Sequence, residues 1–144
     1  GRKLSRDRGA VMHRLIGQMN ADASALAMQA DAVLASLGKS LQRGVDELNK
    51  ATASLLVSEP REAAACAVPY LWLAGTVTGG WLMCRAADAA TVQLGAGGDD
   101  ASFLQAKRVT ALHFARHMLQ QAPAMCEAVA HGAESSLGLH QDQF

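Results

Sequence analysis

Two histidines in the C-terminal half of the chain have a spacing that could bind a metal ion. His113 and His117 stand four positions apart in the segment LHFARHM, which places both imidazoles on one face of a helix. A zinc site needs a third protein ligand, which would have to come from Cys126 or His131, and neither need share that face. No glutamate follows the first histidine as in the H-E-x-x-H motif. We therefore expect ordinary surface or interface histidines and no metal site.

A cysteine nucleophile is the second chemistry that the residues allow. Cys126 is followed by Glu127 and His131, but no third group stands at a spacing that would complete a catalytic arrangement. Apolar neighbours raise the pKa of a thiol and make it inert, so a buried structural cysteine is expected. The chain has three cysteines, with Cys66 and Cys84 far apart and no C-x-x-C pair, which indicates reduced thiols in a cytoplasmic protein.

Two further patterns could bind phosphate groups. Residues 95–98 are rich in glycine, but no strand precedes them and no Lys or Ser/Thr follows, so they are expected to form a turn. The start of the chain is basic, although 13 basic and 13 acidic residues balance overall. Its cations are Arg2, Lys3, Arg6, Arg8 and Arg14. Because no aromatic residues lie among them, we expect a solvated connector and no nucleic-acid partner. No catalytic, cofactor-binding or metal-binding residue is assigned in this chain.

The elements that carry these side chains are expected to be helical, since no segment alternates with a period of two. A first apolar stripe at steps of three and four runs from residue 12 to 37, as one helix or two. A break is expected near Gly17, Asn20 or Asp22, and a stop or pause at Gly38. A second stripe over residues 41–55 has charged and amide side chains on its outer side, which is typical of an amphipathic surface helix.

Two longer helices are expected in the second half of the chain. Ser58-Glu59-Pro60 is typical of a helix start, and that helix is predicted over residues 59–94. Asp99-Asp100 then offers N-cap side chains for a helix over residues 100–131. Interior prolines, Pro69 and Pro123, predict a bend in each helix. The expected fold is all-α, an up-and-down bundle of four to five long helices in a single domain of residues 1–144.

Residues 63–84 contain no charge and are long enough to span a bilayer. Ala, Gly and Thr dominate the segment, so its transfer into lipid would be marginal, and no membrane partner is expected. A helix that is apolar on every side is central to a bundle or covered by a second subunit. Gly75, Gly79 and Gly80 would let another backbone approach closely, and Trp72 and Trp81 are expected in the core or an interface.

The opening segment GRKLSRDRGA resembles the stretch that leaves the catalytic body in acyl-CoA dehydrogenases with an extra C-terminal domain. Its Gly-Arg-Lys-Leu and Asp-x-Gly-Ala sequences are the most specific features, with Arg8 where the family often has glycine. The resemblance continues through ATASLL at 51–56, the segment 68–85, which is uncharged up to Arg85, and F-x-x-A-K at 103–107. It therefore covers essentially the whole chain.

The resemblance implies a non-catalytic C-terminal helical domain of an FAD-dependent acyl-CoA dehydrogenase. Residues 1–10 would be the connector from an upstream catalytic body, with Gly1 as a cut point. FAD, the acyl-CoA substrate and the catalytic glutamate would belong to that body. The domain would pack on the body or on another subunit through the uncharged helix, in a homo-oligomer. A free-standing helical dimerisation module and a membrane-associated helical protein are the alternatives.

Overall fold

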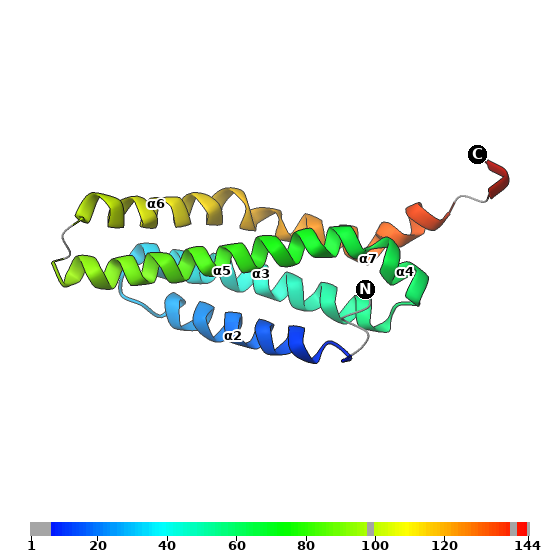
Figure 1. Ribbon diagram of the computed structural model, residues 1–144, viewed down its shortest axis with the longest axis horizontal. Helices are drawn as coiled ribbons and strands as arrows, with labels where there is room; N and C mark the ends of the chain where they lie inside the picture. The colour runs from blue at the N-terminus through cyan, green and yellow to red at the C-terminus, as the bar shows by residue number, and fades with distance from the viewer. Residues whose placement is uncertain (1–6, 98–99, 139–140, 144) are drawn as a thin grey trace.

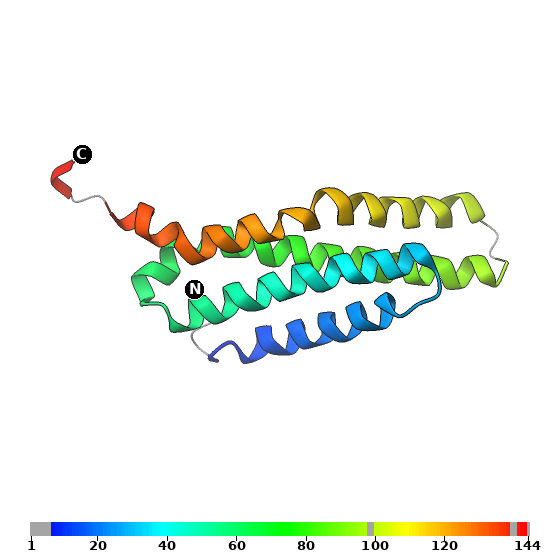
Figure 2. The same ribbon diagram turned by 180° about the vertical axis from the view of Figure 1, so that it is seen from behind.

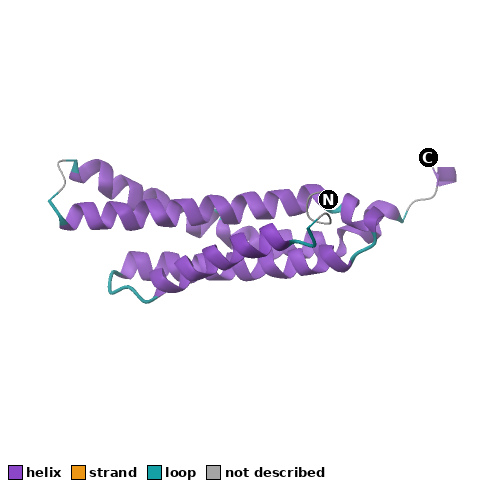
Figure 3. Ribbon diagram, turned by 60° about the horizontal axis from the view of Figure 1, so that its bottom comes forward, coloured by secondary structure: helices purple, strands orange, loops and turns teal. Residues whose placement is uncertain are grey.

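A computed structural model describes residues 7–97, 100–138 and 141–143, and every regular element in these ranges is helical (Figures 1 and 3). The helices are α2 (Ala10–Ala27), α3 (Ala32–Val57), α4 (Pro60–Ala65), α5 (Ala67–Gly95), α6 (Ala101–His117) and α7 (Ala122–Leu137), with short 3-10 helices η1 (Leu119–Gln121) and η2 (Gln141–Gln143). Successive long segments run up and down, with α6 and α7 forming the last of them (Figure 1). The expected all-α bundle is confirmed.

Helix α3 is the centre of the bundle. It packs against α2, α5, α6 and α7, and lies behind α5 in Figure 1 and in front of it in Figure 2. Leu37, Leu41 and Leu48 on this helix have no exposed surface. The sequence indicated the stripe over residues 41–55 as part of a surface helix. In the structure this stripe belongs to the central helix, and its apolar face packs against the other helices of the bundle.

The break in the first apolar stripe comes later than the sequence indicated. Neither Gly17, Asn20 nor Asp22 interrupts α2, which ends at Ala27, and α3 begins after Asp31. The Asp31 carboxylate accepts hydrogen bonds from the backbone N–H groups of Val33 (2.9 Å) and Leu34 (3.0 Å). An aspartate cap of this kind starts a helix because it satisfies N–H groups that lack a partner in the first turn.

Gly38 lies inside α3 and does not end a helix. A Cβ at this position would lie 2.3 Å from the backbone nitrogen of Ala27 and 2.7 Å from the carbonyl oxygen of Ala23. The two helices therefore cross with their backbones in close approach. The glycine is required by the packing between α2 and α3. In a sequence, such a glycine cannot be told from one that ends a helix, and this is why a stop was predicted here.

Asp31 also holds the α2–α3 connection against α6. The guanidinium Nη2 of Arg108 donates to both carboxylate oxygens, at 2.9 and 2.7 Å. The hydrogen bond from the Leu34 N–H is the largest influence that lowers the pKa of Asp31, with Arg108 acting in the same direction and burial opposing both. Because the folded-state pKa is lowered, this stabilisation is present above the ordinary carboxyl range and is lost as the pH falls through the folded value.

We expect Asp31→Ala to lower the free energy of unfolding by about 2 kcal/mol, because it removes both the cap and the ion pair. Asp31→Asn keeps a side-chain oxygen for the cap, so it should cost only about half as much. Urea unfolding at pH 7, followed by circular dichroism, measures both values. Equal losses in the two variants would contradict the capping role.

Both interior prolines interrupt their helices as expected. Pro69 cannot donate to the carbonyl of Ala65, and the chain restarts as α5 after Cys66. Pro123 is the second residue of α7, which follows the 3-10 turn η1. The two predicted bends are thus confirmed, each as the start of a new helix.

Two polar contacts connect helices that are distant in the sequence. The buried Thr52 hydroxyl donates to the Leu48 carbonyl (2.7 Å) and accepts from the Tyr70 hydroxyl (2.9 Å), which joins α3 to α5. The indole N–H of Trp81 donates to the Asp22 carboxylate (2.7 Å), which joins α5 to α2. Trp81 packs on the core, as expected for one of the two tryptophans.

The chain enters α2 through a left-handed turn. Arg8 has φ 53° and Gly9 has φ 77°, and the Gly9 N–H donates to the Asp7 carboxylate (3.0 Å). Glycine adopts this region without strain, whereas Arg8, which has a Cβ, adopts it at an energetic cost. Arg2, Lys3 and Arg6 of the basic segment lie outside the described residues, as does the predicted capping residue Asp99. Asp100, its neighbour, does cap α6, by accepting from the Phe103 N–H (3.0 Å).

Candidate functional site

The predicted histidine pair lies on one exposed face of α6. The rings of His113 and His117 have centroids 4.3 Å apart and are tilted by 33°. Neither proposed third ligand joins them. Cys126 is buried on α7, and His131 is on the same helix, where its Nε2 atom lies 3.5 Å from the Glu127 carboxylate. Within residues 7–97, 100–138 and 141–143, no group of three or more His, Cys, Asp or Glu side chains could hold a metal ion.

Cys126 lies in an environment that keeps its thiol protonated. Burial is the main cause that raises its pKa to about 11, and the Glu47 carboxylate adds to the effect. His131, the candidate base, pairs with Glu127 on its own helix. A cysteine nucleophile needs a lowered pKa or a base in contact with the thiol, and this environment does the opposite.

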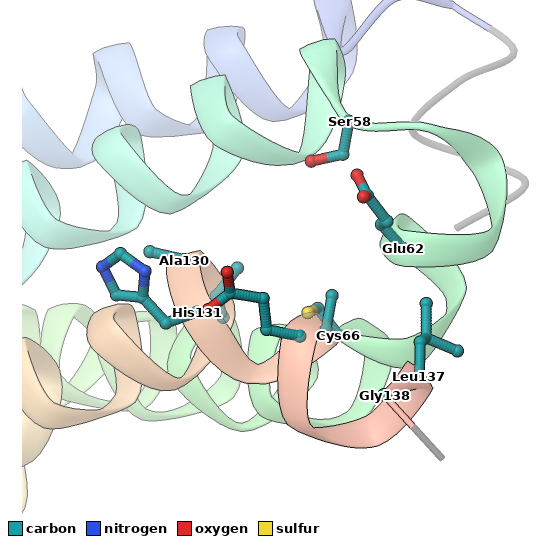
Figure 4. Close-up of a pocket in the computed structure, with 10 residues that line it drawn as sticks. Ser58, Glu62, Cys66, Ala130, His131, Leu137 and Gly138 are labelled. Atoms are coloured by element: carbon teal, nitrogen blue, oxygen red, sulfur yellow. The ribbon is translucent and has the colours of Figure 1, made fainter. Parts of the chain in front are cut away.

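A hollow of about 330 Å³ lies between α4 and α7 (Figure 4), and His131 is the residue of its lining that the sequence had indicated as a candidate. Its polar lining includes Ser58, Glu62, His131 and Glu134, and the buried Cys66 forms part of its wall. Helices α4 and α7 are distant in the sequence and are in contact in the fold. Two carboxylates in the lining would repel phosphate groups, so the hollow does not suit the diphosphate of a flavin or coenzyme A.

The exposed side of α5 is the feature that the sequence did not resolve. Tyr70, Leu73 and Val77 face the core, but Leu71 is 67% exposed and Trp72 is 66% exposed. The expectation that this helix is apolar on every side is met, yet the chain covers only one side. Trp72 is therefore not a core residue of this chain.

We define the outer stripe of α5 by eight residues at alternating steps of four and three. They are Val68, Trp72, Gly75, Gly79, Leu82, Ala86, Ala89 and Gln93. None carries a charge, and all but the half-buried Gly79 are exposed. This spacing was present in the sequence, and it is the signal by which the stripe could have been found. No helix in the described part of the chain is long and apolar enough to cross a membrane.

Comparison with known proteins assigns the chain to a family. A family model described as "Acetyl-CoA dehydrogenase C-terminal like" matches residues 15–140, which include most of α2 and all of α3 to α7. The chain belongs to this acyl-CoA dehydrogenase C-terminal-like family. The resemblance read from the sequence is thus confirmed.

The acyl-CoA dehydrogenase C-terminal-like domain is also similar to one named enzyme. It is 34% identical over 143 residues to 3-methylmercaptopropionyl-CoA dehydrogenase of Ruegeria pomeroyi (strain ATCC 700808 / DSM 15171 / DSS-3). The matched region covers 95% of this chain and 24% of that protein. The chain therefore spans about a quarter of the length of the relative.

The hollow between α4 and α7 of the C-terminal-like domain does not offer the groups that bind a flavin diphosphate. Proteins bind the FAD diphosphate through glycine-rich strand–helix turns, helix N-termini or cationic side chains. The hollow at α4 and α7 presents Glu62 and Glu134 instead. No step of flavin chemistry is therefore assigned to a residue of this chain.

Proposed function

We propose that the chain is the non-catalytic C-terminal accessory domain of an FAD-dependent acyl-CoA dehydrogenase of the cytoplasm. The observation that carries this proposal is the 34% identity over 95% of the chain to a named acyl-CoA dehydrogenase of which it covers 24%. FAD and the acyl-CoA thioester would bind to upstream catalytic domains of the same polypeptide. Those domains would perform the α,β-dehydrogenation.

The role proposed for the domain is packing, against the catalytic body or another subunit of a homo-oligomer. The support comes from α5, where Val68, Leu71, Trp72 and Leu82 are each more than half exposed. Exposed apolar side chains that gather on one face mark an interaction surface more often than single exposed ones do. The outer stripe of α5 is the surface through which the domain would pack.

Deletion of the domain from the full-length protein tests this function. We expect the deleted protein to retain bound FAD and to oxidise a panel of acyl-CoA thioesters with kcat within about threefold of the intact enzyme, because the chemistry lies elsewhere. Its melting temperature should fall by about 5 °C or more, or its oligomer should dissociate. Flavin absorbance, dye-coupled turnover, calorimetry and sedimentation measure these four properties.

Two results would overturn parts of the proposal. An intact protein that holds no flavin and oxidises no acyl-CoA in the panel would exclude the dehydrogenase assignment. A deleted protein with unchanged melting temperature and unchanged assembly would exclude the packing role.

A further inference from the structure

We propose that the outer stripe of α5 binds the same stripe of a second copy of this chain, with the two helices antiparallel. This inference deepens the packing role and rests on the proposed function for its biological setting. It commits to a second copy as the partner, whereas the packing role alone leaves the catalytic body as an equal choice. The argument depends on the spacing, size and charge of the stripe residues.

The spacing of the stripe is that of a seam between two helices. Steps of four and three repeat every seven residues, which is the pattern that keeps one helix in contact with another along its length. The stripe spans residues 68–93, or about 38 Å at 1.5 Å per residue. That is longer than α2, whose 18 residues pack along α3. No other helix lies in front of α5 in Figure 1, and α3 covers its opposite side (Figure 2).

The side-chain sizes make the stripe complementary to itself. In an antiparallel pair centred between residues 80 and 81, Trp72 of each copy lies opposite Ala89 of the other. Leu82 then lies opposite Gly79, which is half-buried because the Phe114 side chain of α6 lies 3.3 Å from its Cβ position. The remaining pairs are Val68 with Gln93 and Gly75 with Ala86. A large side chain meets a small one at both central contacts and at the tryptophan, as dense packing requires. A parallel pair would instead place Trp72 against Trp72 and glycine against glycine.

Gly75 supports a close approach from outside the chain. No atom lies within 4 Å of the position that a Cβ would take there, so the fold of this chain does not require a glycine. Gly80 is different, because its Cβ would lie 2.7 Å from the Leu119 side chain. A glycine in a helix interior costs about 1 kcal/mol relative to alanine. An approaching backbone at Gly75 would account for that cost.

The charges of α5 do not oppose the contact. Arg85 and Asp88 are its two charged residues, and both lie outside the stripe. The guanidinium of Arg85 sits 5.3 Å from the Trp81 ring centroid, and the Asp88 carboxylate accepts from Gln29 (3.1 Å). Two copies can therefore bring their stripes together without removing a charge from water, which would be costly.

Cysteine crosslinking in the 144-residue chain tests the orientation. Val68→Cys and Gln93→Cys are prepared separately, one with a mass tag, then mixed and oxidised with copper phenanthroline. Antiparallel pairing predicts crosslinks between the two variants. It predicts none within either variant, because equivalent ends lie about 38 Å apart along the pair. Wild type is the control, since Cys66, Cys84 and Cys126 are buried at 2%, 1% and 7% exposure.

Sedimentation of two matched variants tests the surface. Trp72→Glu should raise the dimer dissociation constant at least a hundredfold, because it places a charge in the seam. Val109→Glu should leave that constant unchanged, since Val109 is equally exposed (66%) but lies on α6 outside the stripe. Weak dimers form at concentrations of about 100 μM. A chain that is still monomeric at about 100 μM would overturn the proposal. Crosslinks within each variant, or equal effects of both substitutions, would also overturn it.

The outcome is separable from that of the proposed function. Crosslinks between the variants would support the antiparallel contact, even if the full-length protein binds no flavin and oxidises no acyl-CoA. That second result would exclude the dehydrogenase assignment alone. An active flavoenzyme whose C-terminal domain shows neither self-association nor crosslinks would exclude the contact alone.

Discussion

Replacement of Gly38 by alanine is expected to lower the free energy of unfolding by about 3 kcal/mol or more. The new Cβ would lie 2.3 Å from the Ala27 nitrogen and 2.7 Å from the Ala23 carbonyl oxygen. Both are backbone atoms, so no side-chain rotation can relieve the clash. Helix α2 must move away from α3, and contacts of the fully buried Met19 and Ala23 are loosened as it does.

Gly17→Ala is the matched control for this substitution. Gly17 is an exposed residue of α2, and no atom lies within 4 Å of its Cβ position. Alanine there should raise stability by about 1 kcal/mol, because it has the higher helix propensity. Urea unfolding followed by circular dichroism compares both variants with wild type. Wild-type stability in Gly38→Ala would show that the close helix crossing is not required.

The helical fold could be predicted because the apolar periodicity is continuous, but the same continuity concealed where the helices end. Leu26 and Leu34 lie on either side of the α2–α3 connection, and both point into the core. The stripe therefore keeps its phase through the break. Asp31 marks the true helix start, although an aspartate followed by apolar residues also occurs within helices. Its partner Arg108, which lies 77 positions away, is brought to it only by the tertiary fold.

Gly38 illustrates a second limit of the sequence. A glycine after a helix and a glycine at a helix crossing are both selected for the missing Cβ, one for its φ angle and the other for space. The prolines were easier to interpret, because loss of the N–H donor has the same local consequence in any tertiary setting. Pro69 and Pro123 accordingly predicted both interruptions near their observed positions.

The candidate site was predictable only where it depends on one helix. Helical geometry places His113 and His117 on one face, as observed, but the position of Cys126 relative to them depends on how α7 restarts after η1. The hollow at Glu62 and Glu134 likewise depends on the tertiary contact between α4 and α7. For α5, composition indicated a helix apolar on every side, and only the positions of α3, α6 and α7 show which side the chain leaves uncovered.

The stability of the domain is expected to decline above pH 9 because of Cys84. Its thiol is 1% exposed at the contact of α5 with α3, and burial raises its pKa from 9.0 to about 12. Above pH 9 the thiol ionises in the unfolded chain but stays protonated in the folded one. The folded state therefore binds the proton more tightly. The free energy of unfolding falls by about 1.4 kcal/mol for each unit that the pH rises, or ~3 kcal/mol by pH 11.

Cys84→Ala separates this contribution from those of other groups. The variant should lose about 1 kcal/mol at pH 8 through the smaller side chain, but its stability should decline less between pH 9 and 11. Tyr70 and Cys126, whose pKa values are also raised by burial, titrate in both proteins and cancel in the comparison. Urea unfolding at each pH measures the difference. Parallel curves would mean that the Cys84 thiol ionises as readily in the folded state as in the unfolded one, which requires water to reach it between α3 and α5.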